Sequence, residues 1–336
     1  MKRRDFIKAA AAGSAGVPLL ASSADSCIQG AGLPGGTAAK RATGLTLANL
    51  RTASSPTLAV KTSMGILDAV KAAKAFGKKV PLTTDALIRT GEGQLKEVVE
   101  AALRLRRKEF FLAADSAAFA PCVTNPQKIV CVGINYKKHA LETGLAAVTV
   151  PTLFNKYNNA LNHHDGTIKT AGLPGDHFDY EAELVIVMGE RCQNVPEQEA
   201  LNYVFGYCTG NDFSERTYQF ITRQSMIGKT SDGFGPIGPY LVTADLVGDP
   251  NNLKIECSVN GELRQSSSTS DMIFSCAQII AFASKLFPLE AGDIIFTGTP
   301  EGVILGKPKD KQVWLKAGDK VRTDIEKLGT LNFTVV

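Results

Sequence analysis

Two carboxylates spaced two residues apart, Glu181 and Glu183, carry the strongest chemical signal in this chain. They stand near the start of the run from Asp179 to Met188 (DYEAELVIVM), whose β-branched apolar residues predict a buried strand. Because side chains alternate along a strand, both carboxylates should lie on one face, with Cα atoms about 7 Å apart. Two like charges at the edge of a core lose hydration and repel each other, so a divalent cation is expected between them.

A third oxygen ligand is available at Asp212, which follows the apolar run Tyr203–Cys208 and therefore lies at the end of another strand. Three carboxylates without His or Cys favour a hard cation, Mg²⁺ or Mn²⁺ and less so Ca²⁺. The alternative is that Glu181 and Glu183 line the solvent-facing side of an edge strand. Spacing alone leaves both interpretations open.

The elements around these residues predict a mainly β (α+β) protein. After Asn125-Pro126 the chain alternates short β-like runs with Gly, Pro and Asn-Gly turns, which is typical of layered, mainly antiparallel or mixed sheets. Asn260-Gly261 predicts a hairpin, and a Ser/Thr-rich cap predicts a helix over about 271–286. Residues 125–336 are therefore expected to form one large, mainly β domain, which contains the carboxylates.

Residues 44–124 are expected to form a small α+β domain without chemistry of its own. The pattern there predicts a short strand near Leu58–Val60, a helix from Met64 to Phe76 that ends at Gly77, and a second helix from Gln94 to Arg107. In the second helix apolar residues recur at near-helical spacing, so one face should pack inward.

The N-terminus resembles a twin-arginine export signal. Arg3-Arg4 precede a mild apolar stretch, small residues allow cleavage after Ala24, and residues 25–43 are composed like a flexible linker. The apolar stretch, Ala9–Leu20, is too short for a stable membrane span. We therefore expect a periplasmic or exported protein, or a cytoplasmic one if the signal (residues 1–24) is not used.

Charge and cysteine content restrict the partners. Residues 1–24 contain four basic residues and one acidic residue, so their removal lowers the net charge from +4 to +1. This balance gives no reason to expect nucleic acid or anionic lipid, and a small polar metabolite fits better. The seven cysteines include no C-x-x-C pair, and four lie in apolar runs, which predicts buried free thiols: Cys131, Cys208, Cys257 and Cys276.

Five ordered motifs carry a family resemblance from about Lys128 to the C-terminus. They are GINYKKHALE from Gly133, DYEAE from Asp179, GNDFSER from Gly210, K-x-x-D-x-F-x-P-x-GP from Lys229 and TGTP from Thr297. In this order and spacing the chain resembles the fumarylacetoacetate hydrolase superfamily. The resemblance implies a mixed β-sandwich roll, Mg²⁺ or Mn²⁺ on carboxylates matching Glu181, Glu183 and Asp212, 2-oxo or 1,3-dicarbonyl acid substrates, and a homodimer.

His139 and Glu142 are expected to form the catalytic base. Three residues apart on one helical turn, they share a face, and Glu142 can hold the imidazole in the tautomer that draws a proton from water. Lys229 is expected to offset the negative charge of the three carboxylates and of a developing oxyanion. The alternatives are a surface histidine with an incidental acidic neighbour and a solvated loop lysine, while Asp232 is a candidate to orient Lys229.

The resemblance also implies substrate-binding positions: Tyr136, Lys156, Arg216, Gln219 and Thr299. Arg216 and Gln219 match positions that reach toward the far end of the substrate, where a guanidinium suits a second carboxylate. Lys156 could equally form a surface salt bridge. The turn at Thr299 can offer N–H groups to a substrate carboxylate.

We expect a metal-dependent hydrolase that cleaves a C–C bond in an acylpyruvate-type acid, such as fumarylacetoacetate or fumarylpyruvate, with water activated by His139. The nearest alternative is an isomerase or decarboxylase of 2-hydroxy-2,4-dienedioate-type acids at the same metal site. A second alternative is an exported, non-catalytic protein that binds oxo acids. A complete set of His139, Glu142 and Lys229 disfavours that last interpretation, because binding alone needs no base.

Overall fold

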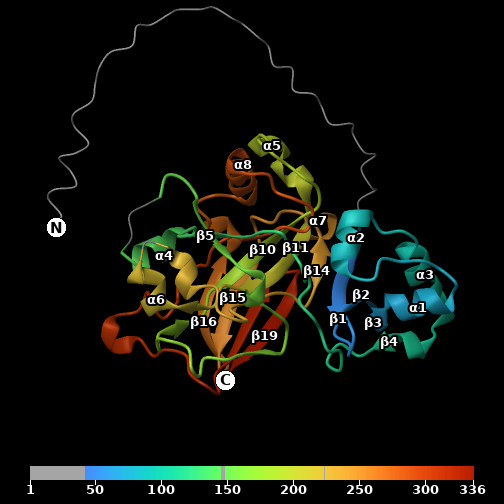
Figure 1. Cartoon of the computed structure of the whole chain (residues 1–336), viewed down its shortest axis with the longest axis horizontal. Coiled ribbons are helices and arrows are strands. Elements are labelled where there is room, and N and C mark those ends of the chain that lie inside the picture. Colours follow the sequence, from blue (N-terminus) through green and yellow to red (C-terminus); the bar gives the residue numbers. More distant parts are fainter. Residues whose placement is uncertain (1–41, 145–147, 223) are drawn as a thin grey trace, which may run out of the picture. The chain divides into compact units, whose positions relative to one another are not determined.

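A computed structural model describes residues 42–144, 148–222 and 224–336 of the chain (Figure 1). These residues belong to one unit of dense internal contacts, Ala39–Val336. The expected export signal and nearly all of the expected linker lie outside the described residues. Among the described residues, no helix is both long and apolar enough to cross a bilayer.

The larger of two main sheets has ten strands. Its order is β4 (Phe111–Leu112), β3 (Gly65–Asp68), β2 (Thr57–Thr62), β1 (Thr46–Leu50), β14 (Leu241–Thr243), β11 (Val204–Asn211), β10 (Ala182–Met188), β17 (Ile294–Phe296), β5 (Ile129–Gly133) and β6 (Thr152–Lys156). Neighbouring strands are antiparallel except β17 and β5, which run parallel. The sheet is therefore mixed.

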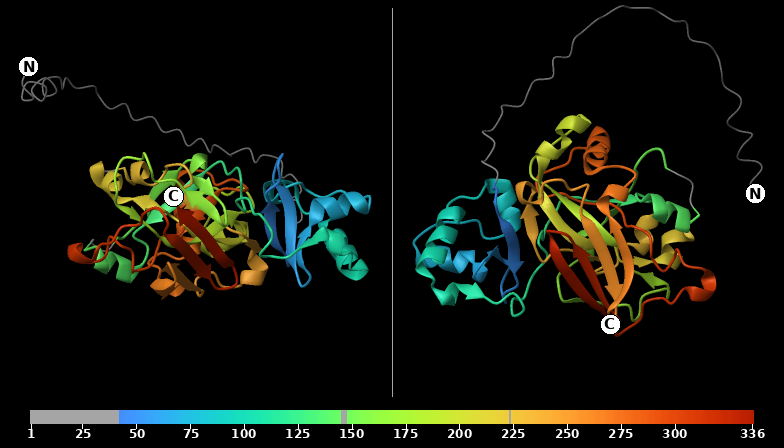
Figure 2. Two further views of the ribbon diagram at one scale, coloured as in Figure 1. Left: turned by 90° about the horizontal axis from the view of Figure 1, so that it is seen from below. Right: turned by 180° about the vertical axis from the view of Figure 1, so that it is seen from behind.

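The second main sheet has five strands. Its order is β16 (Glu262–Ser268), β15 (Lys254–Val259), β18 (Lys320–Ile325), β19 (Gly329–Val335) and β8 (Gly166–Ile168), with only β19 and β8 parallel. Two short pairs complete the strands: β9 (Phe178–Asp179) with β12 (Ser214–Glu215), and β7 (Leu161–Asn162) with β13 (Gly235–Pro236). The expected mainly β, mixed sandwich is confirmed (Figure 2).

The described helices are short. The α-helices are α1 (Ala69–Ala75), α2 (Thr84–Thr90), α3 (Leu95–Leu105), α4 (Lys137–Glu142), α5 (Glu197–Ala200), α6 (Arg216–Ile221), α7 (Ala244–Val247) and α8 (Cys276–Leu286). The 3₁₀ turns are η1 (Lys108–Phe110), η2 (Asn158–Ala160), η3 (Leu201–Tyr203), η4 (Ser225–Gly228), η5 (Thr269–Asp271) and η6 (Lys309–Lys311). Helices α4 and α6, together with η4, contribute to the candidate site.

Strand β10 is the central positioning element because both of its faces are buried. Its even-numbered residues, such as Leu184 and Ile186, pack in a core cluster with strands β15 and β18 of the second sheet. Its odd-numbered residues Val185 and Val187 pack in another cluster with β1 and helices α2 and α3. A strand buried on both faces reads as a continuous apolar run, as this one does.

The predicted helix over Met64–Phe76 is wrong in its first half. Residues 65–68 form β3 instead, which pairs with both β2 and β4, and the helix α1 starts only at Ala69. Gly65 has φ +116° and passes close to the backbone of Leu112. The side chain of Asp68 accepts a hydrogen bond from Lys71 N–H and so starts the helix four residues after Gly65.

The other predicted elements differ mainly at their ends. The helix expected over 271–286 is α8, which begins at Cys276 with a capping box between Ser275 and Gln278. Residues 273 and 274 are not helical because their N–H groups bond to the backbone and side chain of Asn135. The predicted strand near 58–60, the helix over 94–107 and the Asn260-Gly261 hairpin are confirmed as β2, α3 and the β15–β16 turn.

Strand β1 pairs with β14, so the sheet continues across the expected domain boundary near residue 125. Cα partners in this pair include Leu47 with Leu241. The division into 44–124 and 125–336 stays a prediction. The free, buried cysteines expected in the apolar runs are confirmed, and every described cysteine is buried and unpaired.

Candidate active site

The three candidate metal ligands converge at one end of the β10–β11 pair. Glu181 directly precedes β10, Glu183 lies within it, and Asp212 directly follows β11; the register places Ala182 opposite Asn211. One carboxylate oxygen from each residue lies within 4.8 Å of the others, and all three side chains are buried. The expectation that Glu181 and Glu183 share a face is confirmed, and the edge-strand alternative is excluded because β10 lies between β11 and β17.

Three buried cations surround this cluster: Lys156, Lys229 and Arg216. Lys229 Nζ lies 2.6 Å from Glu181 Oε2 and 2.9 Å from Asp212 Oδ2. Burial would raise the pKa of Glu181, but the charges of Lys229 and Arg216 outweigh burial and lower this pKa to about 2. Glu181 is therefore held ionised.

Glu183 has the opposite electrostatic environment. Burial, followed by repulsion from Asp212 and Glu181, raises its pKa well above the usual range. Among the described residues, its carboxylate accepts a hydrogen bond from Gly298 N–H, at 2.7 Å. A buried carboxylate beside two others is stabilised by a cation, and an all-oxygen donor set fits Mg²⁺ or Mn²⁺. The residues present therefore fit a hard divalent metal.

Both lysines of the site are buried, so the solvated-loop alternative for Lys229 and the surface salt bridge for Lys156 are excluded. Lys156 Nζ lies 2.5 Å from Asp212 Oδ1 and contacts the carbonyl oxygens of Lys229 and Phe234. Lys156 therefore fixes a candidate metal ligand and the loop that carries Lys229. It does not line the candidate pocket itself.

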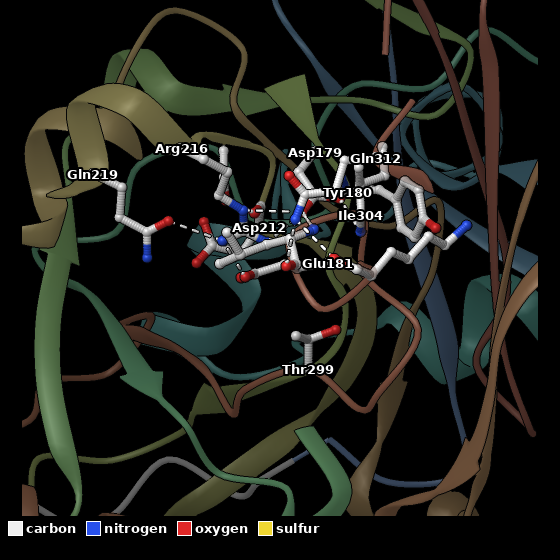
Figure 3. A network of polar contacts seen from close by, with 12 residues as sticks. Asp179, Tyr180, Glu181, Asp212, Arg216, Gln219, Thr299, Ile304 and Gln312 are labelled. Atoms are coloured by element: carbon white, nitrogen blue, oxygen red, sulfur yellow. Dashed lines mark hydrogen bonds and ion pairs between the residues drawn. The ribbon is translucent and has the colours of Figure 1, made fainter. Parts of the chain in front are cut away.

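Arg216 begins α6 and is held between two carboxylates, as Figure 3 shows. Its Nη1 donates to Glu181 Oε1 (2.7 Å) and to Gln219 Oε1 (2.9 Å), while Nε and Nη2 donate to Asp179 Oδ2 (3.0 and 2.8 Å). Arg216 and Gln219 both line the pocket, as expected. However, the carboxylates of Asp179 and Glu181 already neutralise the guanidinium. Its attraction for a distal substrate carboxylate is therefore weaker than the sequence suggested.

His139 and Glu142 lie on α4 and form the expected pair. Nδ1 of His139 is 2.8 Å from Glu142 Oε1, and Glu142 Oε2 accepts a hydrogen bond from Gly302 N–H at 2.9 Å. His139 is buried and lines the same pocket as Glu181 and Glu183. The surface-histidine alternative is therefore excluded.

The remaining expected substrate positions separate into two groups. Thr299 lines the pocket, and its hydroxyl accepts a hydrogen bond from Gln265. Tyr136 is fully buried and does not line the pocket, although its hydroxyl has no hydrogen-bond partner among the described residues. Asp232 accepts a hydrogen bond from Asn159, while Lys229 pairs with Glu181 and Asp212, so the contacts of these residues do not support the prediction that Asp232 orients Lys229.

The pocket bounded by these residues has a volume of about 170 Å³. Apolar side chains such as Leu153, Phe154 and Leu305 share its wall with the carboxylates, His139 and Lys229. A second cavity of about 550 Å³ adjoins it and shares Thr143, Phe220 and Leu305. Glu142 lines this second cavity.

Asp179 is a member of the site that sequence reasoning quoted but gave no role. It is fully buried and accepts hydrogen bonds from Arg216 and from the N–H groups of Ile304 and Leu305. The partners are 37 to 126 residues away in the sequence. No local pattern points to them; the signal was only an unexplained acidic residue before a buried strand.

Comparisons with known proteins agree with this arrangement. The model of the fumarylacetoacetate (FAA) hydrolase C-terminal family matches residues 128–336. An oxaloacetate tautomerase, mitochondrial, of Xenopus laevis is 37% identical over 265 residues, covering 78% of this chain and 81% of that protein. The solved fumarylacetoacetate hydrolase of Exiguobacterium antarcticum superposes with a TM-score of 0.69 at 29% identity, covering 87% and 99% of the two chains.

The fold and the relatives define a class of enzymes whose named members include hydrolases, isomerases and tautomerases. The chain belongs to the fumarylacetoacetate hydrolase superfamily. One solved relative, fumarylpyruvate hydrolase from Pseudomonas aeruginosa, was crystallised with Mn²⁺ and pyruvate; it has a TM-score of 0.58 and 31% identity, covering 66% of this chain and 92% of that one. The acidic cluster of this chain could hold such a metal.

Proposed function

We propose that this chain is a metal-dependent enzyme that moves a proton at the carbon beside the keto group of a small 2-oxo acid, and so interconverts keto and enol forms of an oxaloacetate-type acid. The observation that carries the proposal is the His139–Glu142 pair, 2.8 Å between Nδ1 and Oε1, in the same pocket as the three carboxylates. A base and a cation site within one small cavity are what enolisation needs.

The side chains divide the work. Glu142 accepts the Nδ1 proton of His139, which leaves Nε2 with a lone pair to take a proton from the substrate and return it. Mg²⁺ or Mn²⁺, when bound by Glu181, Glu183 and Asp212, supplies a Lewis acid that stabilises the negative charge of an enolate.

Two observations favour a small acid as substrate. The pocket that holds the base and the carboxylates is small, about 170 Å³, which favours a short acid over a long acylpyruvate. A relative matching about four fifths of both chains carries the name oxaloacetate tautomerase. Unlike hydrolysis, tautomerisation does not need a water molecule in the pocket beside the substrate, so a small pocket is enough.

C–C hydrolysis, the reaction expected from the sequence, is the second candidate. The adjoining cavity of about 550 Å³ offers room for the acyl end of a longer acid, and Glu142 lies between the two cavities as a lining residue of one and the partner of His139 in the other. The structural relative named fumarylpyruvate hydrolase favours the same reaction. In this case His139 would take its proton from water.

One set of assays distinguishes these reactions. Purified protein is incubated with Mg²⁺ or Mn²⁺ and oxaloacetate, acetylpyruvate, fumarylpyruvate or a 2-hydroxy-2,4-dienedioate. Faster decay of enol absorbance, without CO₂ or new acids, supports tautomerisation. Two product acids support hydrolysis, CO₂ supports decarboxylation, and a shifted double bond in a dienedioate supports isomerisation; any of these as the dominant reaction overturns our first proposal. Binding of pyruvate or oxalate without turnover would identify a non-catalytic binding protein.

We further propose that residues 1–24 direct export through the twin-arginine route. The support is the Arg3-Arg4 pair before an apolar stretch. Fusion of residues 1–24 to a folded reporter should place it in the periplasm, and the double change Arg3→Lys with Arg4→Lys should retain it in the cytoplasm. Equal distribution of both fusions would contradict this.

We also propose a homodimer, in line with the family resemblance. Light scattering on the eluting protein should give about twice the chain mass of 35.8 kDa, or less if the signal is removed. A mass of one chain at micromolar concentration would contradict the proposal.

A further inference from the structure

A chain of buried and partly buried hydrogen bonds links the candidate base to the candidate metal ligands through the loop Gly302–Leu305. At one end Gly302 N–H donates to Glu142 Oε2 (2.9 Å), and Tyr180 Oη donates to the carbonyl oxygen of the same glycine (2.8 Å). At the other end Ile304 and Leu305 N–H donate to the two oxygens of Asp179 (2.9 and 3.0 Å). The loop therefore has anchors on both sides.

Asp179 connects this loop to the metal cluster. Besides the two loop N–H groups, its carboxylate accepts two hydrogen bonds from Arg216, whose third nitrogen donates to Glu181 (Figure 3). Asp179 and Arg216 are buried, so these charge-assisted bonds are not screened by water. One acidic side chain thus fixes both the loop that holds Glu142 and the guanidinium that holds Glu181.

We propose that Asp179 is a positioning residue that sets the geometry of the metal ligand Glu181 and of the His139–Glu142 base together. The negative charge of Asp179 offsets the positive charge of the Arg216 guanidinium. Arg216 can therefore orient Glu181 and still leave its carboxylate available to a cation. Without that charge, the uncompensated guanidinium would bind Glu181 more strongly and repel a divalent ion. The same change would release the loop from its anchor and loosen Glu142.

The proposal rests on the metal site of the proposed function, and Mn²⁺ binding separates the two. Dissociation constants are measured by calorimetry or by the electron paramagnetic resonance of free Mn²⁺. For Asp179→Asn we expect Mn²⁺ affinity to fall about 10- to 100-fold, as for other residues that orient metal ligands. Hydrogen exchange of the α4 amides should also become faster.

Two further variants make the test specific. Asp293→Asn removes another fully buried carboxylate with several hydrogen bonds, to Lys128 and Glu290 N–H, and it should leave Mn²⁺ affinity within about twofold. Tyr180→Phe removes only the hydroxyl bonded to Gly302, so it should speed exchange in α4 while keeping Mn²⁺ affinity.

The outcomes are distinct. Failure of the native protein to bind Mn²⁺ overturns the proposed function and this inference together. Native binding with equal affinity in Asp179→Asn overturns only the inference, as does an affinity loss of the same size in Asp293→Asn, which would show a general effect of losing a buried charge. Unchanged exchange in α4 in both Asp179→Asn and Tyr180→Phe overturns the link to the base.

Discussion

The His139–Glu142 pair is the residue-scale feature on which the proposed chemistry depends. His139→Gln keeps the shape of the pocket wall but removes the proposed base, so kcat/KM for the preferred acid should fall about 10²- to 10⁴-fold. Mn²⁺ affinity should stay nearly unchanged, because His139 is not among the three oxygen ligands. His163→Gln, whose imidazole bonds to Arg51, is the matched control. A His139→Gln rate within threefold of the native rate would show that another group is the base.

Glu183 predicts a pH dependence of metal binding. Because burial beside Asp212 and Glu181 raises its pKa, the metal-free protein keeps a proton on Glu183 at pH values where an ordinary glutamate is ionised. A metal needs the carboxylate, so binding should release a proton and tighten as pH rises. Calorimetry with Mn²⁺ in two buffers of different ionisation enthalpy measures this release. The same binding enthalpy in both buffers would contradict it.

At the scale of elements, the contact between α6 and η4 places Arg216 and Gln219 beside Lys229. Gly228, the last residue of η4, lies so close to the backbone of Glu215 and Gln219 that a Cβ atom would overlap both. Gly228→Ala should therefore push the two elements apart and lower kcat/KM at least tenfold. Ile227→Ala, at a half-exposed neighbouring position, should change it little. Equal effects of both variants would mean that the close packing of Gly228 against α6 does not matter for activity.

The shared face of Glu181 and Glu183 and the pairing of His139 with Glu142 could be predicted from the sequence because their signals are local. Glu181 and Glu183 alternate along one strand, and His139 and Glu142 share one helical turn. Asp179 and Lys156 could not be assigned their roles, because each is defined by partners from distant segments, Arg216 and Asp212 respectively. The wrong first half of the 64–76 helix has a similar cause: pairing with β2 and β4 overrides the weak helical pattern of residues 65–68.

At the scale of the whole described molecule, the continuous sheet predicts joint unfolding of residues 42–124 and 125–336. Leu47 in β1 is fully buried opposite β14, so Leu47→Ala should lower the free energy of unfolding by about 2–5 kcal/mol. Trp314, the only tryptophan of the chain, lies in the other part and stacks on His177, so its fluorescence reports unfolding there.

In Leu47→Ala, the urea midpoint of unfolding measured by Trp314 fluorescence should fall, and unfolding should remain a single transition. Leu82→Ala, at an exposed position in the same part of the chain, should leave the midpoint nearly unchanged. An unshifted Trp314 midpoint in Leu47→Ala, with a separate earlier transition by circular dichroism, would indicate two independently unfolding parts.

Every described cysteine is buried, and burial raises the pKa of the Cys131, Cys257 and Cys276 thiols, among others. Thiols in that state react slowly with maleimides. Once Cys27 is replaced by serine, a cysteine introduced at Leu141, whose side chain on α4 is 79% exposed, becomes a selective attachment point for a nitroxide. Relaxation of that label by bound Mn²⁺ would then follow the separation of the α4 helix from the ion throughout turnover.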